Sequence, residues 1–322
     1  MRKALLIGID DYAQAPLNCC VNDAVAVNTL LERNGDGSPN FDTRLETNIS
    51  SQAELRRNIQ ELFSGCGDIA LLFFAGHGLV NELGGYLVTP DAKAYAEGVP
   101  MNDILEYANN SLIANKIIIL DCCYSGNIGN LNLGTTSQAL LKAGTTILTA
   151  SQENECSLEV NGHGIFSNLL IEALQGGAAD LTGNVTPGGI YAFVDQALGP
   201  WLPRPIFKTY VKQFVSLRKI CPQVPLDIIR KLTTYFPSPE ALFQLDPSFE
   251  DTNTPSVPHK IIEPYANSDN VAKFKDLQKL QSIGLVVPDE SPYMYFAAME
   301  SKNCRLTALG AHYWKLVNEN RI

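Results

Sequence analysis

The sequence has no apolar run long enough to cross a membrane, which takes about 20 residues. Its first apolar run, in MRKALLIGIDD, meets acidic residues after six positions, which is too short for the core of a signal peptide. These absences argue against a membrane-spanning protein. The run instead predicts a first β-strand at Lys3–Ile9.

An excess of positive charge is also absent. The chain has 24 Lys and Arg against 34 Asp and Glu, for a net charge of −10. This balance argues against a nucleic-acid coat or a membrane-surface binder. The apolar share of 45% and charged share of 18% are typical of a soluble globular protein, and 322 residues suffice for two domains.

The eight cysteines are not spaced as a disulfide framework or as a zinc site. Two pairs, Cys19–Cys20 and Cys122–Cys123, are adjacent in the chain, which does not suit disulfide pairing. We therefore expect reduced thiols, no metal site and a cytoplasmic location.

Two short apolar stretches end in reactive side chains. Ile117–Leu120 leads to Cys123, and IALLFFAG leads to His77, 46 residues upstream of Cys123. Such runs are typical of parallel strands buried on both faces, and the carboxyl ends of these strands meet at one edge of the sheet. Cys123 and His77 are therefore predicted to lie within reach of each other.

This pairing is the arrangement of a cysteine hydrolase. A thiol with its ordinary pKa near 8.5 is mostly protonated at neutral pH, so Cys123 needs a base such as His77. The same imidazole can protonate the leaving amine, and the N–H groups of Gly78 and Cys123 can form an oxyanion hole. The alternative is an ordinary buried thiol and a structural histidine. It does not explain why both residues end strands at a separation close to the roughly 50 residues known in one class of cysteine peptidase.

Around these residues the sequence resembles the caspase and metacaspase superfamily of cysteine peptidases. FFAGHG (Phe73–Gly78) is similar to the S-G-H-G pattern of metacaspases, and DCCYSG (Asp121–Gly126) is similar to their D-x-C-H-S-G pattern. Ala75 and Tyr124 depart from the pattern, and neither departure removes a catalytic atom.

The resemblance extends from about Lys3 to about Leu217. It implies that Cys123 is the nucleophile and Cys122 its buried neighbour. It also implies an α/β fold with a mostly parallel sheet and helices on both faces.

A specificity follows from the same resemblance. Asn22 and Asp23, in LNCCVNDA, resemble the C-x-N-D segment of metacaspases. There the aspartate and the one two residues before the nucleophile line an acidic pocket for Arg or Lys, and the matching positions here are Asp23 and Asp121. Caspases instead bind a substrate aspartate with arginine, and this chain has no Arg or Lys between Lys3 and Arg33 to supply one. The alternative is that Asp23 only caps a helix.

Calcium is implied for many metacaspases, in which several acidic side chains hold the ion. The corresponding positions here are Asp91, Asn102, Asp103 and Asn130, so half of the negative charge is absent. We expect weak or no calcium dependence and no other cofactor. The alternative for Asp91 and Asp103 is a structural role as loop caps.

Self-cleavage is a further implication, because related enzymes cut the junction of their large and small parts. Lys142 is the only basic residue between Cys123 and a strand predicted at Thr145–Ser151. Lys142 is therefore the candidate self-cleavage site, and the alternative is a solvated lysine on a short helix.

Strand and helix patterns alternate along the first two thirds of the chain, which predicts a sheet flanked by helices. Besides the two strands already described, strands are predicted at Lys3–Ile9, Phe41–Asn48, Thr145–Ser151 and Tyr210–Leu217. Helices are predicted at about Asn18–Arg33, Gln52–Phe63, Asp103–Asn109, Gly164–Leu174 and Ile190–Leu198.

Pro222 and Pro225 mark a boundary where the composition changes. We predict a peptidase domain at 1–220, a connecting helix and proline-rich linker at 221–265, and a winged-helix-like α+β domain at 266–322. The last resembles winged-helix domains in its L-x-x-x-G-L-V and L-T-x-x-G segments. Residues 221–322 contain 10 Lys and Arg against 12 Asp and Glu, so this module is expected to bind a regulatory protein rather than nucleic acid.

The favoured function is a cysteine endopeptidase that cleaves protein substrates after Arg or Lys. Bacterial relatives with an extra module resemble regulated proteases of defence or cell-death pathways, which implies an antiviral or related role and an activating protein. The alternative is a non-catalytic scaffold that acts through its C-terminal module. Such a scaffold would have no need of Cys123, His77 and the two aspartates.

Overall fold

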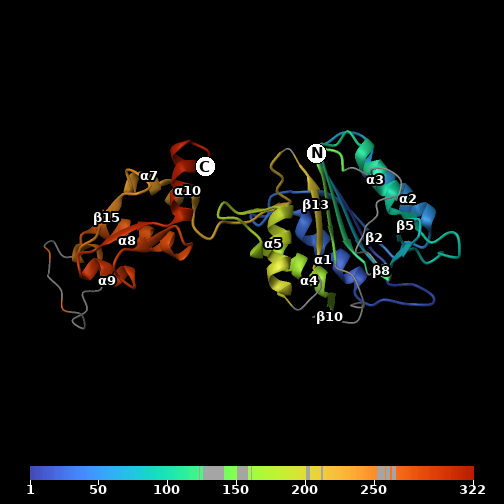
Figure 1. Cartoon of the computed structure of the whole chain (residues 1–322), viewed down its shortest axis with the longest axis horizontal. Helices are drawn as coiled ribbons and strands as arrows, with labels where there is room; N and C mark the ends of the chain where they lie inside the picture. The colour runs from blue at the N-terminus through green and yellow to red at the C-terminus, as the bar shows by residue number, and fades with distance from the viewer. Residues whose placement is uncertain are drawn as a thin grey trace. The chain divides into compact units, whose positions relative to one another are not determined.

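The computed structural model describes residues 1–122, 124–125, 141–150, 159–160, 162–200, 204–211, 213–251, 258, 262 and 266–322. They form two compact units, Met1–Cys221 and Pro222–Ile322 (Figure 1). Each unit has its own sheet and its own helices. Within the described ranges, no helix is both long enough and apolar enough to cross a membrane.

Six strands form the central sheet of the first unit. In spatial order they are β13 (Ile206–Tyr210), β9 (Thr145–Thr149), β7 (Asn115–Asp121), β3 (Ile69–Ala75), β1 (Arg2–Gly8) and β2 (Asp42–Thr47). All neighbours are parallel except β13 and β9. The middle strands have unbroken apolar runs because both faces of the sheet are covered, and every residue of β3 is buried.

Helices cover both faces of this sheet (Figure 1). One face packs against α1 (Cys20–Glu32), α4 (Ile165–Glu172) and α5 (Pro187–Leu198), and the other against α2 (Gln52–Phe63) and α3 (Met101–Asn110). Side chains of β3 alternate between the two cores: Leu72 and Phe74 face α2 and α3, whereas Leu71 and Phe73 face the other three helices. The predicted α/β class, with helices on both faces, is confirmed.

A smaller sheet continues from the carboxyl ends of β3 and β7. In it β4 (Gly78–Asn81) lies between β5 (Gly84–Leu87) and β8 (Tyr124–Ser125), and β6 (Val99–Pro100) pairs with β5. Two short antiparallel pairs complete the unit: β10 (Glu159–Val160) with β11 (His163–Gly164), and β12 (Asn184–Val185) with β14 (Arg218–Lys219). A π-helical turn at Ala173–Gly177 follows α4.

One predicted strand is wrong. The central sheet ends at β13, whereas the sequence predicted its last strand at Tyr210–Leu217. Val215 and Leu217 are buried in the core, and the Leu217 N–H donates to Val185 O at 2.8 Å rather than joining the central sheet. The apolar alternation that resembled a strand reflects the packing of a connecting segment on this core.

The second unit is a small α+β assembly. Its helices are α6 (Leu226–Arg230), α7 (Leu232–Tyr235), α8 (Ser268–Ser282), α9 (Met294–Met299) and α10 (Ala308–Asn318). In its antiparallel sheet, β17 (Asn303–Leu306) lies between β15 (Leu242–Gln244) and β16 (Val286–Pro288). The winged-helix identity stays a prediction.

Aromatic packing explains why part of the segment 221–265, expected to be a linker, belongs to this unit. Phe243 of β15 lies 6.1 Å from Phe236 and 5.8 Å from Phe249, measured between ring centroids. Phe249 in turn contacts Phe274 of α8, with centroids 6.4 Å apart. Burial of these rings gives residues around β15 a structural role that a proline-rich composition conceals.

Candidate active site

The two strand pairs that meet at this edge of the sheet, β3 with β7 and β4 with β8, have the same register. Ala75 at the end of β3 pairs with Asp121 at the end of β7. Gly78 at the start of β4 pairs with Tyr124 at the start of β8. Both pairs are separated by 46 positions in the chain, so the two intervening connections are of equal length.

His77 occupies the second position of the connection between β3 and β4. Cys123, the predicted nucleophile, occupies the second position between β7 and β8 in the sequence, and it lies outside the described residues. The separation of 46 residues between His77 and Cys123 is the same as that of the paired residues on either side.

Tyr12, in the loop between β1 and α1, holds the backbone and the ring of His77. The His77 N–H donates to Tyr12 Oη at 3.1 Å, and the Tyr12 hydroxyl donates to Val88 O at 3.1 Å. The two rings meet edge-on with centroids 4.5 Å apart. Since Tyr12 is only 7% exposed, this contact gives His77 a fixed support.

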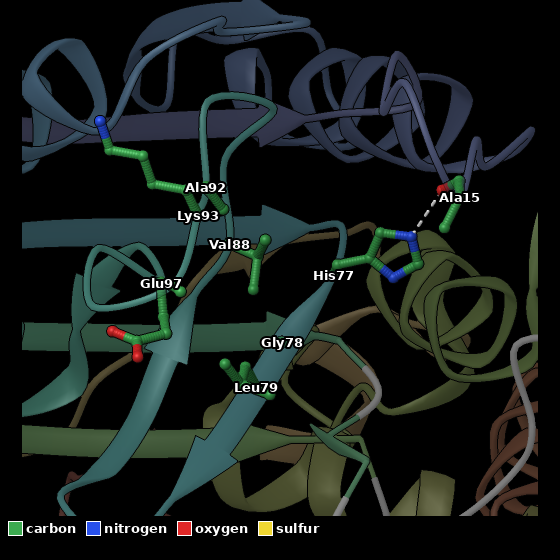
Figure 2. A pocket seen from close by; sticks show the side chains of 9 residues that line it. Ala15, His77, Gly78, Leu79, Val88, Ala92, Lys93 and Glu97 are labelled. Atoms are coloured by element: carbon green, nitrogen blue, oxygen red, sulfur yellow. Dashed lines mark hydrogen bonds between the residues drawn. The ribbon is translucent and has the colours of Figure 1, made fainter.

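The carbonyl of Ala15 determines which imidazole nitrogen can act as a base. His77 Nε2 lies 2.7 Å from Ala15 O, and a carbonyl oxygen can only accept, so Nε2 carries a proton (Figure 2). In the neutral ring Nδ1 then has a lone pair that can take a proton. Ala15 thereby supplies the tautomer selection that a carboxylate supplies in a Ser-His-Asp triad.

Glycine is required next to His77. The Gly76 N–H donates to Asp121 O at 3.2 Å, and a Cβ on Gly76 would lie 2.7 Å from Tyr12 Oη and 2.9 Å from Phe74. A larger residue would displace Tyr12 and, with it, His77. Gly78, predicted to contribute to the oxyanion hole, is buried at the start of β4.

An open pocket of about 420 Å³ adjoins His77 (Figure 2). His77 and Ala15 lie at one end of it, and Lys93 and Glu97 lie at the other. Its remaining lining is small or apolar, with Gly78, Leu79, Val88, Ala92 and Ala94. The pocket could therefore hold an apolar side chain beside the imidazole.

The two aspartates predicted to bind a basic side chain lie close together. Asp23 is on α1, Asp121 ends β7, and both approach Gly164 of β11. A Cβ on Gly164 would lie 3.1 Å from Asp121 Oδ2 and 3.5 Å from Asp23 Oδ2. Asp23 is 2% exposed, whereas Asp121 is partly exposed.

The side chain that accepts from the first N–H groups of α1 belongs to Asp10 rather than to Asp23. Asp10 accepts from the N–H groups of Cys20 and Val21 at 2.9 and 3.2 Å. The carboxylate of Asp23 instead faces His163, whose Nδ1 lies 2.6 Å from Asp23 Oδ1. The alternative of a simple helix cap is therefore wrong for Asp23, because its oxygens bond to β11 and not to the first turn of α1.

Among the residues around Asp23 and Asp121, His163 is the one that the sequence did not indicate. It lies in NGHG just before α4, among loop-like residues, and its contact with Asp23 spans most of the domain's sequence. No local pattern reports a pairing of that kind. In the sequence around His163, only the glycines on either side of it indicate an unusual backbone conformation.

Burial shifts the acidity of both aspartates. Burial and the neighbouring charge of Asp121 raise the pKa of Asp23 to about 7, and the hydrogen bonds from His163 and Gly164 oppose this rise. Burial also raises the pKa of Asp121, and two hydrogen bonds from Ser167 oppose it. Two carboxylates that lack full solvation are suited to bind a cation.

Two of the four positions that match calcium ligands have other partners. Asp103 Oδ2 pairs with Arg56 Nη1 at 2.8 Å, and Asp91 accepts from the N–H of Gln52, the first residue of α2, at 3.0 Å. Asn130 lies outside the described residues. Among the residues that the structure describes, no group of three or more His, Cys, Asp and Glu could hold a metal ion. The expected lack of calcium dependence stays a prediction.

Lys142 is an exposed residue of the segment that leads into β9, and it lies in no helix. Its N–H donates to Asn109 Oδ1 at 3.0 Å and its Nζ donates to Asn110 Oδ1 at 3.2 Å. An exposed, non-helical lysine is accessible to a protease. Self-cleavage at Lys142 stays a prediction.

A family model described as the caspase domain matches residues 1–199. The chain belongs to the caspase-domain family. The resemblance predicted from the two motifs is thus confirmed, and the caspase domain places the chain in a class of cysteine peptidases. Among curated proteins, none matches this chain.

Solved structures with the same fold include a protein of Geobacter sulfurreducens, GSU0716. It is 16% identical, with a TM-score of 0.51 over 67% of this chain and 96% of that one. Caspase-1 from Spodoptera frugiperda is 14% identical, with a TM-score of 0.49 over 68% of this chain and 90% of that one. At 16% identity, the likeness to GSU0716 concerns the fold alone.

Proposed function

We propose that this caspase-domain protein is a cysteine endopeptidase in which Cys123 is the nucleophile and His77 the general base and acid. The observation that carries the proposal is the register around the site. The pairs before and after His77 share the 46-residue offset that separates His77 from Cys123. A parallel pair of strands with equal connections would present both side chains at the same edge of the sheet.

In the proposed reaction, Nδ1 of His77 takes the proton of the Cys123 thiol, and the sulfur attacks the peptide carbonyl. The N–H groups of Gly78 and Cys123 stabilise the oxyanion. His77 then donates the proton to the leaving amine, which leaves a thioester on Cys123. A water molecule, deprotonated by His77, hydrolyses the thioester and regenerates the thiol.

Specificity for Arg or Lys is supported by the acidic pair. Asp121 is partly exposed and would contact the cation first, and the nearly buried Asp23 would add a second negative charge behind it. Attraction to a guanidinium or ammonium is strong in such a site, because poorly solvated carboxylates gain the most from a cation. A substrate aspartate would be repelled by the same charges.

The pocket beside His77 would receive the residue that follows the cleaved bond. β4 lies between β8, which follows Cys123 in the chain, and β5, which leads to the pocket residues Val88 and Ala92. His77 must reach the leaving amine, so the leaving part of the substrate would lie on the β5 side. The small and apolar lining favours an apolar residue there.

Fluorogenic peptides that end in Arg, Lys or Asp test this function, with wild type and Cys123→Ala, each with and without Ca²⁺. We expect cleavage after Arg and Lys, a loss of at least about 10³-fold in the variant, and no effect of Ca²⁺. Cleavage after Asp would overturn the assigned specificity. Absence of cleavage in the peptides and in cell lysate would favour the scaffold alternative.

The second unit is proposed to bind a regulatory protein. Leu242, Tyr293 and Leu309 are exposed by 53%, 63% and 46%, and large apolar side chains of this kind are common in protein interfaces. A role in bacterial defence or cell death is supported by the resemblance alone, and a cytoplasmic location by the cysteine pattern of the sequence. A partner captured by residues 222–322 with these three residues intact, and lost when they are replaced by Ser, would support the regulatory role.

A further inference from the structure

We propose that His163 is a positioning residue of the acidic pair, which orients Asp23 and favours its negatively charged form for a basic substrate side chain. This inference rests on the proposed function, in which Asp23 and Asp121 bind the Arg or Lys of the substrate. His163 would act through Asp23 rather than by contact with the substrate.

The backbone on both sides of His163 is held in place. His163 pairs with Val160 and Gly164 pairs with Glu159 in the β10–β11 hairpin, and Gly164 is the residue that precedes α4. His163 Nδ1 lies 2.6 Å from Asp23 Oδ1, and the Gly164 N–H donates to Asp23 Oδ2 at 3.4 Å. Both oxygens of Asp23 are thus bonded to one short strand, which determines the direction of the carboxylate.

Asp23 needs such a partner because its surroundings oppose its charge. It is 2% exposed, and Asp121 lies across Gly164 from it. The other described titratable groups nearby are Asp10 and Cys20, and burial and Asp10 raise the pKa of the Cys20 thiol, which stays protonated. None of these groups offers a positive charge, so His163 is the basic partner of Asp23 among the described residues.

Ser167 plays the matching part for Asp121. Its N–H donates to Asp121 Oδ2 at 3.2 Å, and its hydroxyl donates to the same oxygen. The segment from His163 to Ser167 therefore provides side-chain donors to both aspartates. Without the hydrogen bond from His163, the pKa of Asp23 would rise further above its usual range, and at neutral pH the pocket would lose one of its two negative charges.

The test compares two peptides that differ only at the cleaved position, with arginine or with citrulline, its uncharged isostere. The ratio of their kcat/KM values is measured from pH 6 to 9 for wild type, His163→Ala and His163→Gln. The reacting groups are the same for both peptides, so the ratio reports the acidic pair. Glu172→Gln, which removes an exposed charge from α4, is the control and should leave the ratio unchanged.

We expect the wild-type ratio to rise with pH through about 7, as Asp23 loses its proton. In His163→Ala the ratio should be about tenfold lower at pH 7, through KM of the arginine peptide, and should recover by pH 9. His163→Gln, whose amide can donate the same hydrogen bond, should stay within about threefold of wild type.

A ratio that is unchanged in His163→Ala at every pH, with wild type still preferring arginine, would overturn this inference and leave the proposed function standing. A loss that does not recover at pH 9 would show a merely structural role and overturn it as well. If wild type does not prefer arginine at any pH, this inference and the proposed specificity for Arg or Lys are both wrong.

Two further measurements apply if His163→Ala does not fold or if the enzyme shows no turnover of the peptides. His163→Phe fills the same space without a donor and should reproduce the effect of His163→Ala. Calorimetric binding of the two peptides to Cys123→Ala, with and without the His163 substitution, gives the same ratio from dissociation constants. An equal ratio in both proteins would overturn the inference.

Discussion

At the residue scale, the hydroxyl of Tyr12 links the backbone of His77 to its surroundings. Tyr12 Oη accepts from the His77 N–H and donates to Val88 O, so it joins the connection after β3 to the segment after β5. The carbonyl of Ala15 then sets the tautomer of the ring. Both supports come from one loop between β1 and α1: Tyr12 bonds to the backbone of His77, and Ala15 contacts its ring.

Tyr12→Phe removes this hydroxyl and leaves the ring. We expect kcat to fall by about tenfold with little change in KM, because the imidazole of His77 is no longer held in a fixed position relative to the reacting groups. The unpaired His77 N–H should also lower the free energy of unfolding by about 1–2 kcal/mol. Tyr191→Phe, on a tyrosine that stacks on Phe207 away from the site, is the control. Equal kinetics of Tyr12→Phe and wild type would contradict the role of Tyr12.

Asp23 provides a pH-dependent prediction about stability. Its pKa is raised in the folded protein to about 7, so its contribution to stability is present in acid and is lost as pH rises from about 4 to about 7. Asp23→Asn cannot ionise. Above pH 7 it should be more stable than wild type by on the order of 3 kcal/mol, and at pH 4 the difference should vanish. Thermal unfolding across this range measures it, and a difference independent of pH would contradict the assignment.

The sequence allowed prediction of His77, Cys123 and the aspartate pair as candidates because each lies in a short, recognisable segment. Tyr12, Ala15 and His163 could not be found in this way. They act through contacts between segments up to 140 residues apart, and a tyrosine or histidine in a polar loop has no local pattern that reveals its partner. Their roles follow only from the packing of α1 and its preceding loop on the sheet.

At the scale of elements, the site depends on the register of β3, β7 and the small sheet. The apolar runs predicted β3 and β7 correctly. A central parallel strand is buried on both faces, so nearly every one of its residues must be apolar. The edge strand β13 was misplaced, since an edge strand and a buried connecting segment share the same apolar alternation.

The turn before β9 tests how tightly the register is set. Gly144 has φ +84°, accepts from the Lys116 N–H and donates to Tyr210 O, and a Cβ there would collide with Ala114 O. Gly144→Ala should lower the free energy of unfolding by about 3 kcal/mol, from strain and overpacking together. Gly37→Ala is the matched control, with φ +83° and no atom within 4 Å, and should cost about 1 kcal/mol.

Chemical denaturation measures both variants. An equal decrease in the free energy of unfolding for the two variants would mean that the turn at Gly144 can shift to accept a Cβ. The close approach of Ala114 would then not constrain β7 and β9.

At the scale of the whole molecule, the chain has two units with separate sheets and cores. Units with their own core are expected to fold independently. Residues 1–221 alone should therefore unfold in one cooperative transition and cleave the arginine peptide at least as fast as the full chain, because a regulatory unit has been removed. An insoluble or inactive fragment would show instead that residues 222–322 complete the peptidase.

The assignment of Cys123 and its acidic pair is tested most directly by covalent labelling. A peptide with a terminal arginine acyloxymethyl ketone is incubated with wild type, Cys123→Ala and His77→Ala, and the modified residue is located by mass spectrometry. We predict one adduct, on Cys123, that forms far more slowly in His77→Ala and far more slowly with the citrulline analogue. An adduct on Cys122, or on the exposed Cys66 or Cys221 in place of Cys123, would contradict the proposed mechanism.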